Sequence, residues 1–303
     1  MKFETHTLKN DLKVVLAPME GAESVTVMVM TGTGSRFESK KENGMAHFLE
    51  HMLFKGRKRR PTVQIISEEV DGVGGIFNAF TSKDHTAYYA KVDKRHFATA
   101  FDVVSDIFLN AALPAGEITR ERGAVIEEIN MYEDMPIRSV LDTFDALLFG
   151  SVHPLGRTIL GPKENIRSFS KRDFVQYLNR NYVAGNSVVC IAGSFSKSQA
   201  LKSVRKAFED MREGEVPACV AYEHLQERPR VAIKYKETDQ THFVLGVLSY
   251  PHHHKLEAAT EVLTAILGGG MSSRLFREVR DRRGLAYYVK AENDRYTDAG
   301  NVY

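Results

Sequence analysis

The sequence has little cysteine, no long hydrophobic run and no excess of either charge. Two cysteines, Cys190 and Cys219, cannot build a disulfide framework, which suits a reducing compartment. No run of 18 apolar residues occurs, and the first residues contain no apolar signal core. With 41 basic and 39 acidic residues, the sequence gives no basic face for nucleic acid. We therefore expect a soluble, cytoplasmic protein with no membrane or nucleic-acid partner.

The length and the composition predict about two folded domains, because the chain has 303 residues, of which 43% are hydrophobic and 26% charged. Helical and strand patterns intermingle without regular βαβ alternation, which favours an α+β fold. Predicted strands lie at 12–16, 25–29, 75–80, 86–92, 187–192, 231–235 and 243–248. Predicted helices lie at 44–55, 62–72, 95–111, 115–134, 138–149, 170–181, 197–209, 256–267 and 272–282.

The domain organisation follows from a break in these patterns and from a weak repeat. We expect an N-terminal domain at 1–212, a charged linker at 213–229 and a second domain at 230–303. The repeat is a constant offset of 209 residues, at which Glu69-Val70 and Gly75 recur as Glu278-Val279 and Gly284. A duplicated domain explains this offset, and chance similarity is the alternative. If the domain is duplicated, we expect the second copy to be incomplete, because the offset makes Tyr303 correspond to Lys94, shortly after the predicted strand 86–92.

A metal-ligand pattern lies in the predicted helix 44–55, for which Asn43 is the candidate N-cap. The pattern is His47-Phe48-Leu49-Glu50-His51. On a helix, His47 and His51 lie one turn apart on one face, where two imidazoles can bind one zinc ion, and Glu50 falls in the same arc. A single histidine here is more simply a hydrogen-bonded core residue. Three titratable groups on an otherwise apolar, buried helix are costly without a cation, so we expect one Zn²⁺ per chain.

The third zinc ligand is expected on the helix 115–134. Its buried stripe consists of Ile118, Val125, Ile129 and Tyr132. Glu128 and Glu121 lie beside this stripe, whereas Glu127 faces water. We therefore predict Glu128 as the metal ligand and Glu121 as a partner of the ligands, with a surface salt bridge as the alternative for Glu121.

Four stretches of the chain match the pitrilysin/insulinase family of zinc metallopeptidases. They are Ala46-His47-Phe48-Leu49-Glu50-His51-Met52-Leu53-Phe54-Lys55-Gly56, Phe77-Asn78-Ala79-Phe80-Thr81-Ser82, Glu121-Arg122-Gly123 with Glu127-Glu128, and Pro154-Leu155-Gly156-Arg157-Thr158-Ile159-Leu160-Gly161. The first contains the inverzincin pattern H-x-x-E-H. The sequence resembles most the branch with the mitochondrial processing peptidase β subunit and its bacterial relatives. This resemblance extends over essentially the whole chain and implies two homologous α/β sandwich domains, each an antiparallel-rich sheet packed with helices.

The resemblance also implies roles for individual residues. It makes Glu50 the general base for a zinc-bound water, and it agrees with the third ligand and its partner chosen above. It makes Arg280 and Tyr287 donors to the oxyanion, whereas without it they are an arginine of a solvated helix and a strand residue. It places Asn78 and Ala79 in an edge strand that pairs with the substrate backbone, whereas without it Asn78 simply ends a strand.

The expected function is that of a zinc endopeptidase that hydrolyses unfolded or extended peptides inside a chamber of two halves. A half-chamber exposes apolar surface, so we expect a homodimer or a heterodimer with a related subunit. One alternative is a catalytically silent relative that serves as a structural or substrate-binding subunit, and another is a metal-dependent hydrolase of a non-peptide substrate. The intact ligand pattern argues against the silent relative. Neither the run His252-His253-His254 nor His85 predicts a site.

Overall fold

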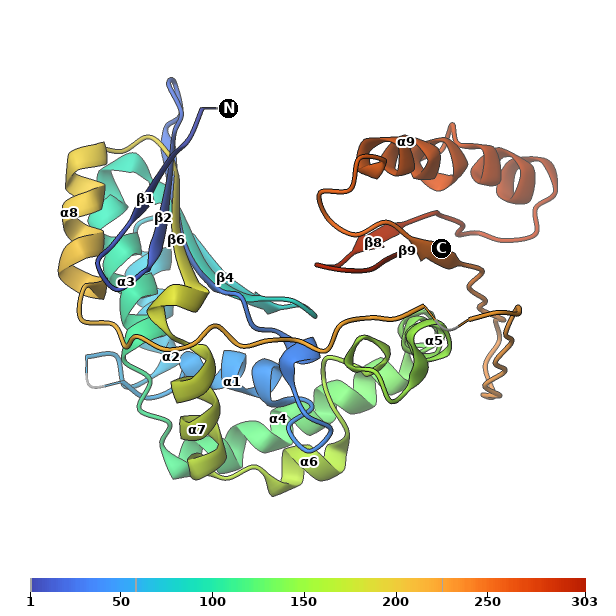
Figure 1. Ribbon diagram of the computed structural model, residues 1–303, viewed down its shortest axis with the longest axis horizontal. Coiled ribbons are helices and arrows are strands. Elements are labelled where there is room, and N and C mark those ends of the chain that lie inside the picture. Colours follow the sequence, from blue (N-terminus) through green and yellow to red (C-terminus); the bar gives the residue numbers. More distant parts are fainter. Residues whose placement is uncertain (1, 58, 225) are drawn as a thin grey trace. The chain divides into compact units, whose positions relative to one another are not determined.

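The chain forms two compact units, each with helices and a sheet, in a computed structural model that describes residues 2–57, 59–224 and 226–303 (Figure 1). The first unit comprises Met1–Met131 and Thr158–Cys219, and the second comprises Tyr132–Arg157 and Val220–Tyr303. This division differs from the predicted boundary at residue 212, because the segment 132–157 packs with the second unit.

The first unit is built on a six-stranded sheet with the order β1-β2-β6-β3-β5-β4. These strands are Glu4–Thr7, Lys13–Pro18, Ser187–Gly193, Ser24–Thr31, Thr86–Asp93 and Ile76–Thr81, in the order of the sheet. All neighbouring strands are antiparallel except β2 and β6. Val25, Val27 and Val29 of β3 are fully buried, as the alternating pattern predicts. Strand β4 lies at the edge of the sheet.

The helices of the first unit cover this sheet and carry the site. They are α1 (Met45–Leu53), α2 (Val63–Asp71), α3 (Phe97–Leu109), α4 (Ala115–Asp134, which ends in the second unit), α6 (Lys163–Ser168), α7 (Lys171–Asn181) and α8 (Lys197–Phe208). Helix α3 packs on β3 and β5, and α1 packs on β4 and α7. Among the described residues, no helix is long and apolar enough to span a membrane.

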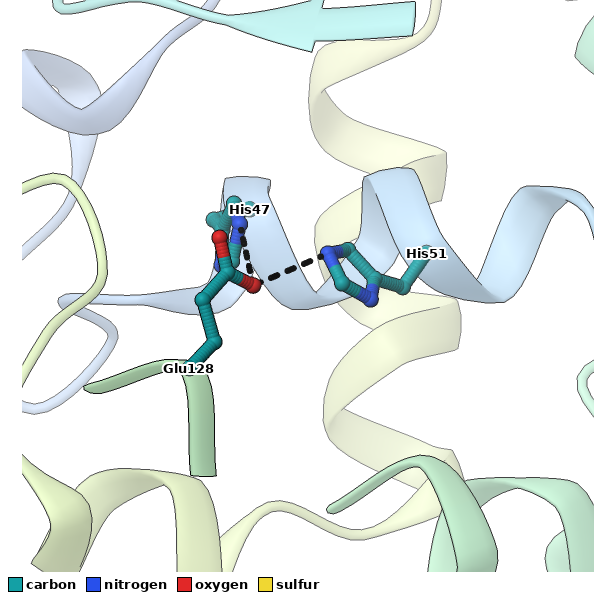
Figure 2. A group of neighbouring side chains, drawn as sticks. All are labelled: His47, His51 and Glu128. Carbon is teal, nitrogen blue, oxygen red and sulfur yellow. Dashed lines mark ion pairs between the residues drawn. The ribbon is translucent and has the colours of Figure 1, made fainter. Parts of the chain in front are cut away.

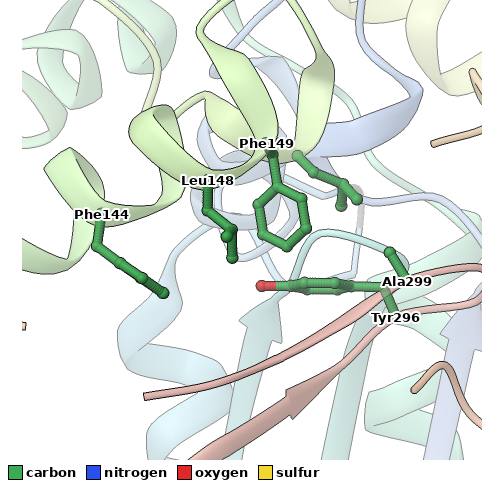
Figure 3. Packing of buried hydrophobic residues seen from close by; sticks show 6 residues of the cluster. Phe144, Leu148, Phe149, Tyr296 and Ala299 are labelled. Atoms are coloured by element: carbon green, nitrogen blue, oxygen red, sulfur yellow. The ribbon is translucent and has the colours of Figure 1, made fainter. Parts of the chain in front are cut away.

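The second unit has a smaller sheet and its own core. Its strands are β7 (Val247–Ser249), β9 (Gly300–Val302) and β8 (Asn293–Arg295), in that order. Its helical segments are α5 (Pro136–Asp145), a π-helix at Ala146–Gly150, a 3-10 turn at Pro154–Gly156, α9 (Glu257–Gly268) and a π-helix at Phe276–Arg282. Phe144, Leu148, Phe149 and Leu155 pack there with Tyr296 and Ala299 (Figure 3). This core is the reason why the segment 132–157 belongs to the second unit.

Every helix and strand predicted before residue 210 is confirmed to within two residues at each end, except the helix at 138–149. That helix begins at Pro136, and its last turns are the π-helix from Ala146. The strand predicted at 231–235 is wrong, because this segment has no regular structure, and of 243–248 only the end forms a strand. Val231 and Ile233 are 83% and 90% exposed, so their side chains are not packed as those of a sheet strand would be. An apolar pattern forms a strand only where a neighbouring strand pairs with it.

Candidate metal centre

Helix α1, which carries both histidines, is buried and held at its first residue. Phe48 packs edge-to-face on Phe174 of α7, with ring centroids 4.9 Å apart. Gly44 is the N-cap, with φ at 100°, and a Cβ there would lie 2.6 Å from the carbonyl oxygen of Leu160. Only glycine adopts this backbone conformation without strain so close to the backbone of Leu160. The predicted N-cap Asn43 is therefore wrong by one residue.

The carboxyl group that caps α1 comes from Glu38, six residues before the N-cap. Its Oε2 accepts from the backbone N of Gly44 at 2.9 Å, and its Oε1 accepts from the backbone N of Ala46 at 2.6 Å. Burial raises the pKa of Glu38 to about 8, against the opposite effect of these hydrogen bonds and of one from Asn43. Two of the free N–H groups of the helix are satisfied in this way, directly before His47.

Replacing Glu38 by alanine is expected to lower the free energy of unfolding by about 3 kcal/mol, because two buried N–H groups lose their acceptor. Urea unfolding followed by circular dichroism measures this change. Glu20→Ala, at an exposed position, is the matched control and should change the stability little. Equal stability of the Glu38 and Glu20 variants would contradict the capping role.

Three side chains converge between α1 and α4 (Figure 2). The Oε2 atom of Glu128 lies 3.4 Å from Nε2 of His47 and 3.4 Å from Nε2 of His51. One ligand atom of each side chain lies within 4.8 Å of the other two. Glu128 is partly buried and its neighbour Glu127 is exposed, so the helical period distinguishes the two carboxylates correctly.

This arrangement fits a zinc ion. Bonds of about 2.0–2.2 Å in a tetrahedral site separate ligand atoms by roughly 3.3–3.5 Å, and the two distances to the oxygen of Glu128 fall in that range. Two imidazole nitrogens and one carboxylate oxygen are a donor set of catalytic zinc sites. The Nδ1 atom of His47 is buried and makes no hydrogen bond with the described residues, so the polar contact of this ring is that of Nε2 with Glu128.

Glu121 orients the second histidine. Its Oε1 lies 3.0 Å from Nδ1 of His51, and its Oε2 lies 2.8 Å from Nζ of Lys55. The hydrogen bond with His51, followed by that with Lys55, lowers the pKa of Glu121 to about 2 despite burial. Burial would lower the pKa of His51, but Glu121 and the charges of Glu128 and Glu50 raise it above its usual value. The hydrogen bond with His47 lowers the pKa of Glu128. The cluster therefore holds ionised carboxylates beside both rings.

Replacing Glu121 by alanine is expected to weaken zinc binding by about 10–100-fold, because His51 loses the group that fixes its tautomer and its orientation. Competition with a chromogenic zinc chelator measures the dissociation constant. Glu117→Ala, one turn earlier on the same helix, is the matched control. An unchanged affinity in the Glu121 variant would leave this residue with only the alternative role of a salt bridge.

Glu50, the predicted base, lies on α1 beside His51, and its Oε2 accepts a hydrogen bond of 2.5 Å from Oγ1 of Thr81. Thr81 is the last residue of the edge strand β4, which also carries Asn78 and Ala79. Asn78 is exposed, and its Oδ1 accepts from the backbone N of Ala79 at 2.8 Å. The expectation that these two residues lie on an edge strand is confirmed.

Arg280 and Tyr287 both belong to the second unit. The guanidinium of Arg280 lies over the ring of Tyr287, 4.5 Å from its centroid, and over that of Phe276 at 4.7 Å. Tyr287 is 84% exposed. The structure thus brings the two predicted residues together with each other, and their role toward the metal stays a prediction.

Comparisons with known proteins agree with this geometry. The family model described as "Insulinase (Peptidase family M16)" matches residues 13–163, and "Peptidase M16 inactive domain" matches residues 168–303. The "Uncharacterized zinc protease YmxG" of Bacillus subtilis is 38% identical over 299 residues, which cover 98% of this chain and 72% of that protein. The chain belongs to the insulinase (M16) peptidase family. An uncharacterized zinc protease of Mycobacterium leprae is 36% identical, over 97% of this chain and 66% of the relative.

Solved structures show that the chain has the M16 fold. A protease from Helicobacter pylori superposes with a TM-score of 0.90 at 27% identity, over 99% of this chain and 73% of that chain. A peptidase M16 inactive domain from Pseudomonas fluorescens superposes with a TM-score of 0.84 at 19% identity, over 100% of this chain and 73% of that one. The mixed α/β fold predicted for the chain is therefore confirmed.

Glu38 and Thr81, which hold residues of this candidate site, were not predicted. Glu38 lies outside the helix that it caps, so no helical period indicates it. Thr81 lies in a stretch that matches the family, yet a strand pattern does not tell which helix its hydroxyl group meets. Glu38 reaches the helix from the loop just before it, whereas Thr81 and Glu50 are 31 residues apart in the sequence and meet only in the fold.

Proposed function

We propose that this M16 chain is a zinc-dependent endopeptidase that hydrolyses extended peptides. The observation that carries the proposal is the convergence of His47, His51 and Glu128 within 4.8 Å, with Glu50 beside them on α1. The zinc proteases named among the relatives support the metal. The proposal also includes a similarity to the processing peptidases and extended peptides as the substrates.

The chain's own residues have separate tasks in this reaction. A zinc ion held by the three ligands would polarise the substrate carbonyl and lower the pKa of water toward about 7. Glu50 accepts the proton of the attacking water and returns it to the leaving amine. The free edge of β4 at Asn78 and Ala79 pairs with the substrate backbone, which gives affinity with little side-chain selectivity. Arg280 and Tyr287 donate to the carbonyl oxygen as it gains charge.

A catalytically silent role beside a related subunit is the second candidate. The description of the family model over residues 168–303 as an inactive domain favours it. Assembly of two chains, identical or related, is part of either proposal, and apolar side chains of the second unit support it: Tyr235 and Phe243 are 89% and 84% exposed. Light scattering of the purified chain tests assembly, and a monomer at micromolar concentration would argue against it.

The deciding experiment incubates the zinc-loaded chain with a mixed peptide library and identifies the products by mass spectrometry. We expect cleavage that a zinc chelator abolishes and that added zinc restores. A zinc-loaded chain that cleaves no peptide would overturn the endopeptidase proposal in favour of the silent role or of a non-peptide substrate. Cleavage that persists without metal would overturn the mechanism.

A further inference from the structure

The hydrogen bond between Thr81 and Glu50 joins the substrate-binding strand to the catalytic base. Oγ1 of Thr81 donates to Oε2 of Glu50 at 2.5 Å in a partly buried setting. A short bond from a hydroxyl group to a carboxylate is of the charge-assisted kind, which is about twice as strong as a neutral hydrogen bond. In the part of the chain that the structure describes, this hydroxyl is the one hydrogen-bond partner of the Glu50 carboxylate.

The packing of α1 on β4 places these two side chains together. Along β4, Asn78 and Phe80 are exposed, whereas Ala79 and Thr81 alternate with them on the less exposed face. Phe77 of that face packs on Phe54 at the end of α1, with ring centroids 5.8 Å apart. The contact between Glu50 and Thr81 therefore belongs to the same interface between α1 and β4.

The backbone of Thr81 is held firmly. It pairs with Thr86 in the β4–β5 ladder, and the next residue, Ser82, donates its backbone N–H to the carbonyl of His85 at 2.8 Å. Thr86 is fully buried, and its own hydroxyl donates to the carbonyl of Thr33 at 3.0 Å. Threonine is also stiff at χ1 because it is β-branched. The hydroxyl group thus has a fixed position from which to hold Glu50.

We propose that Thr81 is a positioning residue that holds Oε2 of Glu50, so that Oε1 is directed at the attacking water. The inference rests on the proposed function, in which Glu50 is the base and β4 receives the substrate. It adds that β4, which aligns the peptide, also aligns the carboxylate of Glu50. One strand therefore positions both the substrate and the base.

The kinetic test compares Thr81→Val, which keeps the shape and removes the hydroxyl, with Thr81→Ser, which keeps the hydroxyl. In the valine variant kcat should fall about 10–100-fold with KM and zinc content unchanged, because a displaced catalytic group can cost about 10²-fold. Serine should restore most of kcat. Thr26→Val, at a half-buried threonine of β3, is the control and should leave kcat unchanged. Equal kcat of wild type and Thr81→Val, or a change in KM alone, would overturn the inference.

Crystal structures of the zinc-loaded wild type and of Thr81→Val supply a readout that does not depend on activity. We expect an ordered Glu50 in the wild type and a carboxylate that is displaced or in several rotamers in the variant. A carboxylate that does not move in the variant would overturn the inference even if the wild type cleaves peptides. A wild type that cleaves nothing would instead overturn the proposed function, and the position of Glu50 in the two structures would still decide whether Thr81 holds it.

Discussion

Replacing Glu50 by glutamine is expected to lower kcat for peptide cleavage by about 10²–10⁴-fold, the usual contribution of a general base. Glutamine has nearly the shape of glutamate and can still accept the hydrogen bond from Thr81, but it cannot take a proton from water. Since His47, His51 and Glu128 are untouched, zinc content should stay at one ion per chain. Cleavage of a quenched fluorescent peptide, together with elemental analysis of the same sample, measures both quantities.

The control for this experiment is the zinc content itself. Loss of cleavage with full zinc content assigns the effect to the chemistry of Glu50, because metal loss and misfolding would both remove the ion. Equal turnover by the wild type and the glutamine variant would refute the role of Glu50 as base.

Replacing Glu128 by glutamine is expected to weaken zinc binding by at least about 100-fold and to abolish chelator-sensitive cleavage. The expectation follows from the geometry, because Oε2 of Glu128 is the atom that lies 3.4 Å from both imidazole nitrogens. Loss of a residue that only orients a ligand already costs about 10–100-fold in metal affinity, and loss of a charged ligand should cost more. Competition with a zinc chelator and elemental analysis measure the change.

The neighbouring Glu127 gives a matched control one residue away on the same helix. It is exposed, so Glu127→Gln removes the same charge without touching the cluster and should keep both zinc and activity. Equal zinc affinity in the two variants would mean that Glu128 is not a ligand. A loss confined to Glu127→Gln would mean that the two carboxylates had been assigned in the wrong order.

The convergence of His47, His51 and Glu128 could be predicted because it depends mainly on the helical period of each of the two helices. His47 and His51 lie on one face of α1 because they are one helical turn apart, and Glu128 faces inward on α4 because it follows the stripe of Val125 and Ile129. Both the hydrophobic period and the length of a helix can be read from a stretch of about twenty residues, and they show which side chains face inward.

The contacts that hold the cluster in place could not be predicted in the same way. Glu38 reaches α1 from a preceding loop, and Thr81 meets Glu50 only after β4 has packed on α1. The segment 231–235 shows that a local pattern can also predict an element that does not form. Its pattern is that of a strand, but a strand needs a partner whose position no local period specifies.

The position of β6 in the sheet has a consequence for the order in which the protein folds. His47, His51 and Glu128 have all been synthesised once the ribosome passes Glu128. Strand β6, which lies between β2 and β3 in the sheet, begins only at Ser187. Phe174, on which α1 packs, also comes late. Pairing between such distant segments is slow, because the loop must close before the contacts form. A nascent chain therefore exposes His47, His51 and Glu128 before it has the sheet and the helix that hold them together.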